Sequence, residues 1–372
     1  MRKKIIWLIP TLEAGGAQKV LTTLLTHLNH ERYVHHLVVF EKKGIFLNAV
    51  PPNIPVYELK RVKALYGFVW QILLIRFLRY LRKERPDLII SFMWYPNLIA
   101  IMARICTGIN VLVSERLSVK GTEEGKLEEF IRKWVILLLY RKADKIITVS
   151  RQMECHLVSE ARVPPCIVST IYNPVDISRL QNLSMEEVTH EWFGEDMPAI
   201  VGVGRLAHQK GFGYLIKAVD ILKRQGMKCR LVIIGEGPER KTLLNLVESL
   251  GVRDVVAFLG LQKNPYKYLA KATLFVLPSL YEGFPNILVE AMALGVPCIA
   301  TCCPTGPEEI ITEGVNGLLV SPASEKALAE AIMRLLKDPD LRKQLADAGK
   351  KRVEDFRVEK IVKEYENLIL SV

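Results

Sequence analysis

The chain has 372 residues, of which 50% are hydrophobic and 24% charged. This composition is typical of a globular protein and excludes a disordered one, and the length predicts two domains. The net charge of +11 is uneven: residues 1–180 hold 27 Lys and Arg against 15 Asp and Glu, whereas residues 181–372 hold 24 against 25. The positive first half predicts an anionic partner there.

The seven cysteines form no Cys-x-x-Cys pair and no cluster with zinc-site spacing. This pattern predicts a reduced, cytoplasmic protein. The basic residues before Ile5 and the apolar run after them resemble a signal peptide. Because Pro10 interrupts the run early, a first strand is the preferred interpretation. No uninterrupted apolar run in the sequence reaches the length of a membrane span.

In the first half, apolar strands alternate with helical segments. The predicted strands cover 5–9, 36–40, 88–92, 111–114 and 145–149. Apolar strands separated by helices predict a doubly wound parallel sheet. The loop after the first strand contains Gly15-Gly16, which lets backbone approach a ligand above the sheet edge. A plain turn into a helix from about Lys19 to Leu28 explains these glycines equally well.

The segment 60–85 carries eight Lys and Arg against the single acid Glu84, with apolar and aromatic side chains between them. This chemistry predicts a helix that lies in the interface of an anionic membrane. The alternative is a core helix with a basic outer face. Residues 130–142 have similar chemistry. A nucleic-acid partner is not expected, because no nucleic-acid motif accompanies the charge.

Two charged residues, Glu115 and Arg116, follow the strand 111–114 and are expected at the ligand edge of the first sheet. The motif Asn173-Pro174-Val175-Asp176 closes the last strand of this half. We expect the chain to cross there to the second domain, with a hinge over about 174–197.

The second half repeats the alternation of strands and helices. Arg205 and Lys210 follow the strand 200–204, so two cations can converge on one phosphate. The strand 231–234 leads into Gly235-Glu236-Gly237-Pro238, and the strand 255–259 leads into Gly260. Each glycine turn is thus predicted at the carboxyl end of a parallel strand, where ligands bind in such sheets.

The strand 274–277 leads into a loop and a short helix. A strand, a glycine-containing loop and a helix start direct free backbone N–H groups at an anion. Glu282 lies in the loop, and Glu290 lies about one turn into the helix. The alternative is that Glu290 only complements the helix dipole and Glu282 is solvated. The cations at Arg205 and Lys210 favour a shared anion site.

The sequence Asp338-Pro339-Asp340 has the Asp-x-Asp form that holds a metal in some nucleotide-sugar enzymes. It precedes a charged helix and does not follow an apolar strand. We therefore interpret it as a helix N-cap with proline in the first turn. No metal site is predicted.

The ordered set Gly204-Arg205, Lys210-Gly211, Gly235-Glu236-Gly237-Pro238 and Glu282 to Glu290 resembles the retaining nucleotide-sugar-dependent glycosyltransferases of family 4. This resemblance, which extends to Gly15-Gly16 and Ser114-Glu115, covers nearly the whole chain. It implies the GT-B fold, an α/β architecture of two Rossmann-like domains facing across a cleft. Residues 1–183 would form the acceptor-side domain and 184–355 the donor-binding domain. A C-terminal helix at about 356–372 would pack back onto the first domain.

The resemblance also implies roles for individual residues. Three of them would be catalytic: Arg205, Lys210 and Glu282. The others would bind the donor: Gly16, Gly204, Gly235, Glu236, Gly237, Gly283, Phe284, Pro285, Asn286, Ile287, Leu288 and Glu290. Glu290 would accept hydrogen bonds from the ribose hydroxyls, and Glu282 would orient the transferred sugar. Glu115 and Arg116 are placed on the acceptor side. Neither a metal nor a cofactor is implied.

The implied reaction transfers a sugar from a UDP-sugar to a lipid-linked or cell-surface glycan, on the inner face of the cell membrane. The leaving phosphate oxygen would take the acceptor's proton, without a protein nucleophile. A soluble small-molecule glycosyltransferase, a nucleotide-sugar epimerase or hydrolase, and a scaffold without catalysis remain alternatives. The sequence departs from the family at Arg116, where many relatives have His, and at Gln18, where they often have Glu.

Overall fold

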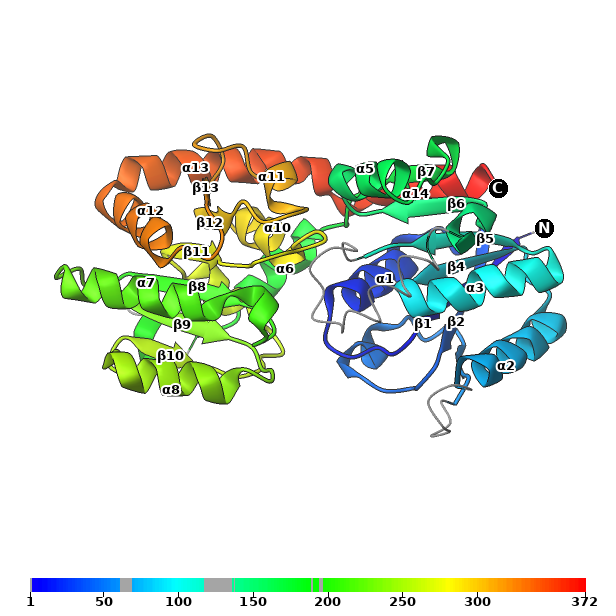
Figure 1. Ribbon diagram of the computed structural model, residues 1–372, viewed down its shortest axis with the longest axis horizontal. Coiled ribbons are helices and arrows are strands. Elements are labelled where there is room, and N and C mark those ends of the chain that lie inside the picture. Colours follow the sequence, from blue (N-terminus) through cyan, green and yellow to red (C-terminus); the bar gives the residue numbers. More distant parts are fainter. Residues whose placement is uncertain (1, 61–68, 117–135, 137, 189, 194–196) are drawn as a thin grey trace. The chain divides into compact units, whose positions relative to one another are not determined.

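The computed structural model describes residues 2–60, 69–116, 136, 138–188, 190–193 and 197–372 (Figure 1). The chain divides into two compact units. The first consists of Met1–Pro174 together with Val358–Val372, and the second consists of Val175–Arg357. Each unit is built around one parallel sheet, as the alternation of apolar strands and helices predicted.

The first unit contains a seven-stranded sheet in the order β3-β2-β1-β4-β5-β6-β7. Its strands are β1 (Lys3–Ile9), β2 (Tyr33–Val39), β3 (Val56–Glu58), β4 (Leu88–Phe92), β5 (Asn110–Ser114), β6 (Lys145–Thr148) and β7 (Val168–Thr170). The sequence analysis missed β3 and gave no range for β7, the last strand that it expected before Asn173. Both are three-residue edge strands that are only partly buried, so neither shows the apolar run of a central strand.

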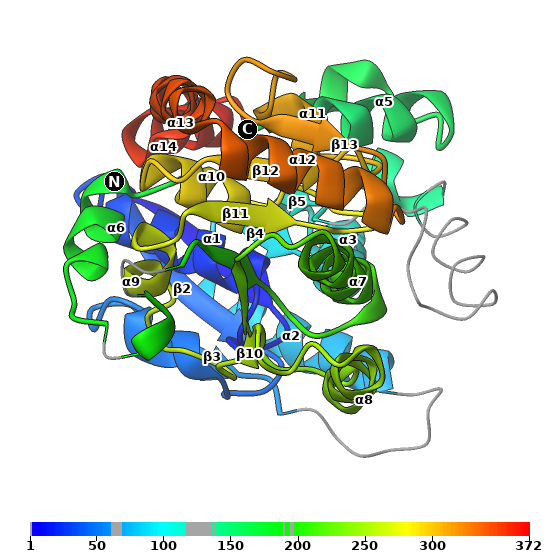
Figure 2. The ribbon, with the colours of Figure 1, turned by 90° about the vertical axis from the view of Figure 1, so that its left-hand side faces the viewer.

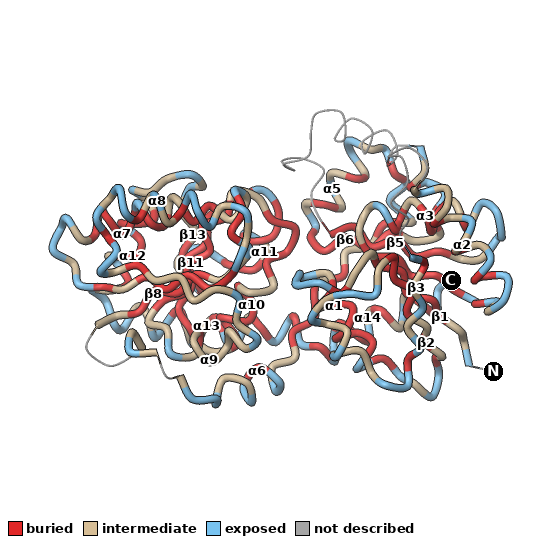
Figure 3. The backbone as a smooth tube through the Cα atoms, turned by 90° about the horizontal axis from the view of Figure 1, so that it is seen from below, coloured by how far each residue is buried: buried red, intermediate tan, exposed pale blue. Residues whose placement is uncertain are grey.

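Helices cover both faces of the first sheet. The principal ones are α1 (Gly16–His27), α2 (Val69–Glu84), α3 (Trp94–Thr107), α5 (Arg151–Ser159) and α14 (Val358–Leu370). The helices α1 and α14 bury one face, which includes Trp7, while α2, α3 and α5 bury the other, which includes Leu8. Figure 3 shows the central strands as an almost continuous buried layer.

The second unit contains a six-stranded parallel sheet in the order β10-β9-β8-β11-β12-β13. Its strands are β8 (Ala199–Val203), β9 (Arg230–Ile234), β10 (Val256–Phe258), β11 (Leu274–Leu277), β12 (Cys298–Thr301) and β13 (Leu318–Val320). One core packs α7 (Phe212–Arg224), α8 (Arg240–Leu250) and α12 (Glu325–Lys337) on one face of this sheet (Figure 2). The other helices of the unit are α6 (Ile177–Ser184), α9 (Tyr266–Ala270), α10 (Asn286–Ala293), α11 (Pro307–Ile310) and α13 (Pro339–Val353).

Each sheet has one place where the order of the strands reverses. In the first sheet the chain adds β2 and β3 on one side of β1 and then returns to place β4 on the other side. In the second sheet β9 and β10 lie on one side of β8, and β11 lies on the other. The loops after the two strands at such a point diverge to opposite faces, which leaves a ligand crevice at their carboxyl ends. The loops after β8 and β11 therefore define the candidate site.

The chain crosses between the units after Pro174, within the Asn173–Asp176 motif where the crossing was expected, so the second unit begins earlier than the boundary expected at 183/184. Asp176 caps α6 through its side chain, which accepts a hydrogen bond from the Arg179 amide. The helix α6 packs against α9 and α10 of the second unit, and Asn264 donates a hydrogen bond to the Leu183 carbonyl. Residues 175–183 therefore belong to the second unit, because α6 finds its packing partners there.

The predicted membrane segment 60–85 falls partly outside the described residues, which omit 61–68, and most of 130–142 also lies outside them. The part that is described, α2, buries Leu73, Phe77 and Leu81 in the first unit and exposes basic side chains. One face of α2 is thus packed in the core and the other is basic, which leaves only the basic face for contact with a membrane. Among the helices within the described ranges, none is both long and apolar enough to cross a bilayer.

The interpretation of Asp338-Pro339-Asp340 as a helix cap is confirmed. The Asp338 carboxylate accepts a hydrogen bond of 2.9 Å from the Leu341 amide, and Pro339 is the first residue of α13.

The burial of His35 makes the stability of the first unit depend on pH. His35 is 3% exposed and its Nδ1 accepts a hydrogen bond of 3.1 Å from Trp7 Nε1. Burial lowers the pKa of His35 from 6.5 to about 4. The unfolded chain therefore binds a proton at a higher pH than the folded chain does, so stability falls between pH 6.5 and 4.

We expect this group to contribute up to about 3 kcal/mol to that loss. Denaturant unfolding of the wild type and His35→Gln at several pH values would measure it, and the variant should show a flatter dependence over this window. His27→Gln, at an exposed site, is the control and should follow the wild type. A slope unchanged in His35→Gln would contradict the prediction.

Candidate functional site

The candidate site centres on an ion pair between the loops that follow β8 and β11. Lys210 Nζ lies 2.5 Å from Glu282 Oε1, and both side chains are largely buried. Lys210 ends the short helical turn His208–Lys210 after β8, while Glu282 lies in the loop after β11. The structure thus brings together two of the three predicted catalytic residues at the point where the strand order reverses.

Further groups that the sequence analysis missed hold this loop in place. Ser279 is fully buried and donates a hydrogen bond of 2.6 Å to the same Glu282 oxygen. The Gln209 side chain donates to the Tyr281 carbonyl at 2.8 Å, and the Thr305 hydroxyl donates to the Glu282 carbonyl. In the sequence, the only sign of a role for Ser279 is its position just after a strand and three residues before Glu282. The Glu282 carboxylate is therefore held by a cation and a hydroxyl together.

Glycines allow three loops of the site to pack backbone against backbone. Gly211 has a φ of +63°, and a Cβ there would lie 2.1 Å from the Pro278 carbonyl oxygen. Gly235 has a φ of +146°, and its Cβ would lie 1.9 Å from the Gly204 carbonyl oxygen. A Cβ on Gly237 would lie 2.3 Å from the Leu206 carbonyl oxygen. The loops after β8, β9 and β11 can therefore approach one another only with glycine at these positions.

The helix α10 begins directly after the Glu282 loop. Pro285 precedes it as the N-cap, and Asn286 is its first residue. The first N–H groups of a helix lack partners within that helix, so its N-terminus favours an anion. Glu290 lies in the second turn of α10 and is 5% exposed. The predicted donor residues 283–288 thus form one continuous strip at the helix start.

Two predicted donor-side charges lie in more open positions. Arg205 is exposed in the loop after β8. Glu236 is also exposed, and its carboxylate lies 3.4 Å from the guanidinium of Arg240, the first residue of α8. Both residues lie in loops at the carboxyl edge of the second sheet, but the ion pair of Lys210 and Glu282 includes neither of them.

A buried thiol lies beside the ion pair. Burial and the negative charge of Glu282 raise the pKa of Cys303 to about 12. The thiol therefore stays protonated near neutral pH and is a poor nucleophile. Among the residues that the structure describes, no group of three His, Cys, Asp or Glu side chains is placed to hold a metal ion.

In the first unit, Glu115 lies directly after β5 and is 2% exposed. The Tyr140 hydroxyl donates a hydrogen bond of 2.5 Å to its carboxylate, and Asn97 in turn donates to Tyr140 at 3.1 Å. The predicted acceptor-side carboxylate is therefore fixed by a buried polar network. Gly16 is exposed at the first position of α1, at the carboxyl edge of the same sheet.

Arg116 is also buried, with 8% of its surface exposed. Its guanidinium donates hydrogen bonds to the Asn173 side chain at 2.5 Å and to the Tyr365 hydroxyl at 3.0 Å. Burial lowers the pKa of Arg116. The acceptor-side role expected for Arg116 stays a prediction.

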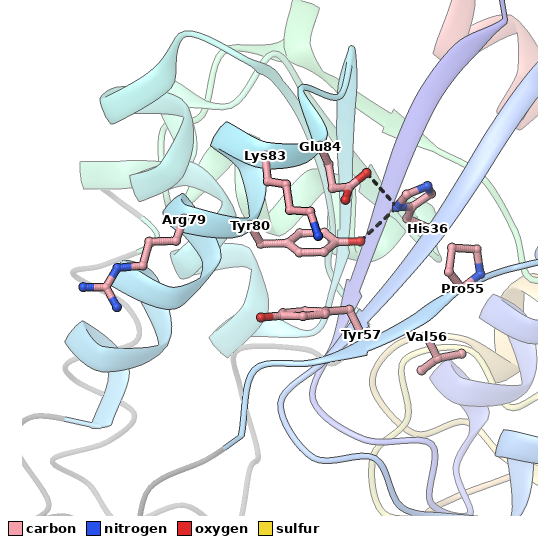
Figure 4. A pocket seen from close by; sticks show the side chains of 8 residues that line it. All are labelled: His36, Pro55, Val56, Tyr57, Arg79, Tyr80, Lys83 and Glu84. Atoms are coloured by element: carbon pink, nitrogen blue, oxygen red, sulfur yellow. Dashed lines mark hydrogen bonds and ion pairs between the residues drawn. The ribbon is translucent and has the colours of Figure 1, made fainter.

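A separate pocket of about 410 Å³ lies in the first unit (Figure 4). The rings of Tyr57 and Tyr80 stack there with their centroids 4.3 Å apart. His36 Nδ1 lies 2.9 Å from the Tyr80 hydroxyl, and Arg79 and Lys83 lie at the rim. The C-terminal end of α2, which lines this pocket, precedes the start of β4 and so lies toward the edge opposite the carboxyl ends of the strands. None of the predicted catalytic or substrate-binding residues lines it.

Comparison with known families matches the two halves of the chain separately. Residues 14–179 match the family model described as Glycosyltransferase Family 4, and residues 189–352 match the model described as Glycosyl transferases group 1.

Two relatives from Campylobacter jejuni are similar along most of the chain. One is named N-acetylgalactosamine-N,N'-diacetylbacillosaminyl-diphospho-undecaprenol 4-alpha-N-acetylgalactosaminyltransferase; it is 29% identical over 327 residues, which is 86% of each chain. The other is an alpha-1,4-N-acetyl-D-galactosaminyltransferase named for a diNAcBac-PP-undecaprenol saccharide; it is 27% identical over 376 residues, which is 99% of each chain.

The crystal structure of Anabaena HepE in complex with UDP and glucose has a TM-score of 0.84, 21% identity and 100% coverage of both chains, which shows a common fold.

The close approach at Gly211 generates a test of the site's architecture. Gly211→Ala places a methyl group against the Pro278 carbonyl and displaces the loop that carries Glu282. Gly226→Ala is the matched control, because Gly226 has a similar φ of +75° but open space around it. The control should cost about 1–2 kcal/mol of unfolding free energy from left-handed strain alone.

Gly211→Ala should cost at least about 2 kcal/mol more than the control, since backbone must shift to relieve the contact. Chemical denaturation measures both variants. If they lose the same stability, the two loops are not in contact at this point.

Proposed function

We propose that this chain, which belongs to the glycosyltransferases of family 4 (group 1), transfers a sugar from a UDP-sugar to a lipid-linked or cell-surface glycan at the cytoplasmic face of the membrane. The fold is GT-B, with two Rossmann-like domains, as the sequence predicted. The two Campylobacter relatives are named for undecaprenol-linked saccharides, which supports an acceptor of that class. The Anabaena structure contains UDP, the nucleotide that we propose here.

The observation that carries the proposal is the pairing of Lys210 with Glu282 at the reversal point of the second sheet, next to the start of α10. The donor diphosphate binds at the N-terminus of α10, where Lys210 and Arg205 contribute positive charge. Negative charge grows on the leaving phosphate as the glycosidic bond breaks. Cations held beside the leaving phosphate stabilise that change more than they stabilise the ground state.

The two carboxylates have different tasks in the proposed reaction. Glu290 accepts hydrogen bonds from the ribose hydroxyls, as a carboxylate does for the ribose in dinucleotide folds. Glu282, held by Lys210 and Ser279, orients the transferred sugar. The acceptor attacks the face from which the phosphate leaves, and the leaving oxygen takes the acceptor's proton. The sugar therefore keeps its anomeric configuration, and the reaction uses neither a protein nucleophile nor a metal.

Incubation of the purified protein with a panel of UDP-sugars and a bacterial membrane extract tests the function. UDP release that depends on the extract, with a new glycolipid seen by mass spectrometry, is the expected result. Release of UDP without any acceptor would indicate a hydrolase, and transfer only to small water-soluble acceptors would indicate a soluble glycosyltransferase. Epimerised UDP-sugar would indicate an epimerase, and the absence of any turnover would indicate a scaffold.

Replacement of either member of the ion pair should stop turnover while the fold survives. We expect Lys210→Ala and Glu282→Gln each to lower kcat by about 10²- to 10³-fold, the size of effect seen when one stabilising group is removed from a transition state. Lys217→Ala is the matched control, because Lys217 is an exposed lysine of the same unit. Near-normal kcat in both site variants would refute the proposed mechanism.

The basic face of α2 is the part of the described chain that we propose contacts the membrane. Arg79, Arg82 and Lys83 are exposed on it, and Trp70 and Ile75 are 39% and 50% exposed. With few exposed apolar side chains, attraction to anionic lipid is mainly electrostatic. Such attraction amounts to about 1 kcal/mol per basic residue near the surface and weakens with salt.

Co-sedimentation with phosphatidylcholine vesicles, with and without phosphatidylglycerol, tests this contact at low and high salt. The wild type should bind only the anionic vesicles, and only at low salt. The triple variant R79A/R82A/K83A should bind at least about tenfold more weakly. The control K337A/K343A/K351A removes the same charge from exposed positions of the second unit and should bind normally. Equal loss in both triple variants would show that net charge, and not α2, determines binding.

A further inference from the structure

The two places where the chain passes between the units lie next to each other. The chain leaves the first unit after Pro174 and returns at Val358. On the second-unit side, Val175 pairs with Arg357 in an isolated parallel bridge, and the Val175 amide donates a hydrogen bond of 2.8 Å to the Phe356 carbonyl. The two crossings therefore run side by side as one double connection.

Within the first unit, the side chain of Arg116 forms hydrogen bonds to one residue near each crossing. Asn173 is the last residue but one before the first crossing, and Tyr365 lies two turns into α14, which follows the second. The Arg116 guanidinium donates to Asn173 Oδ1 through one terminal nitrogen and to the Tyr365 hydroxyl through the other. Because Arg116 follows β5, it links both crossings to the sheet of the first unit.

The surroundings of the guanidinium favour this fixed geometry. Its carbon lies 4.3 Å from the centroid of the Phe92 ring, which contributes a cation–π contact. Tyr365 is fully buried. The planar fork of an arginine can bond two acceptors in set directions at once, whereas the ammonium of a lysine is a compact point charge. Hydrogen bonds to a charged group are stronger than those between neutral groups. Removal of a partner from a buried charge lowers the stability of the protein, because the charge is left uncompensated.

We propose that Arg116 is a positioning residue: its guanidinium holds both crossings against the first sheet, so that the path of each crossing out of the first unit is fixed. This role explains why a residue at the ligand edge of the sheet points into the protein toward Asn173 and Tyr365. The positioning of substrates rests on the proposed transferase function, whereas the fastening itself does not. The partners of the guanidinium, Asn173, Tyr365 and Phe92, all belong to the first unit and none is a predicted donor-binding residue.

The kinetic test uses Arg116→Met, Arg116→Lys and Tyr365→Phe. Tyr365→Phe removes one hydroxyl and keeps the ring in the core, so it tests the role even if an Arg116 variant fails to fold. Each variant should lower kcat about tenfold or more, because small misplacements of reacting groups are costly, while the Kd for UDP changes less than about twofold. The double variant R116M/Y365F should be no slower than Arg116→Met, because both changes break the same link.

Arg104→Met is the matched control. Arg104 pairs with Asp144 in the same unit, away from the crossings, so this variant should lose stability but keep kcat. Hydrogen exchange gives a readout that does not depend on activity: amides of 358–365 should exchange about tenfold faster in Arg116→Met than in Arg104→Met.

Three results would overturn the proposal. Equal protection of 358–365 in Arg116→Met and Arg104→Met would show that Arg116 does not fasten α14. A raised KM for the acceptor in Arg116→Met, with normal kinetics in Tyr365→Phe, would show that Arg116 binds the acceptor directly. Additive effects in the double variant would show two independent roles. If the protein transfers no sugar at all, the transferase proposal fails, and the exchange experiment alone decides the fastening.

Discussion

Parallel pairing of β8 with β11 is the constraint on which the candidate site depends. It joins two strands that are far apart in the sequence and lays their carboxyl ends side by side, so that Lys210 and Glu282 meet at 2.5 Å. A carboxylate as buried as Glu282 needs compensation for its lost hydration. Lys210 and Ser279 provide it from neighbouring loops. The pair therefore fixes the loop after β11 and holds the charge that the proposed chemistry uses.

The glycines around this pair show how closely the backbone must pack to build the site. The loops after β8, β9 and β11 lie against one another with carbonyl oxygens where a Cβ would otherwise lie. This packing leaves no room for a side chain at Gly211, Gly235 or Gly237. The same positions that identify the family in the sequence are thus the ones that the backbone geometry requires.

The first unit uses its charged residues differently. Glu115 and Arg116 lie at the ligand edge of their sheet, where the sequence placed them, but both are held in buried hydrogen-bond networks. The partners of Arg116 come from the end of the first crossing and from α14. Both partners belong to the first unit, as Arg116 itself does. Its contacts make it part of the connection between the units.

The sequence by itself determined the class of fold, the central strands and the strip from Glu282 to Glu290. These features are local: apolar runs mark buried parallel strands, and glycines mark the turns at their ends. It missed the edge strand β3 and gave no range for the edge strand β7, because short, half-exposed strands carry no apolar run. It placed the crossing correctly at Asn173–Asp176 but the domain boundary too late, at 183/184, since α6 is assigned to a unit only by what it packs against.

Only the tertiary structure decided which side chains meet. Ser279 is an ordinary serine in the sequence, and its role follows from the 2.6 Å contact with Glu282. The contacts of Arg116 with Asn173 and Tyr365 join residues that are 57 and 249 positions apart. Contacts at such separations depend on sheet order and helix packing, which no local pattern of residues specifies.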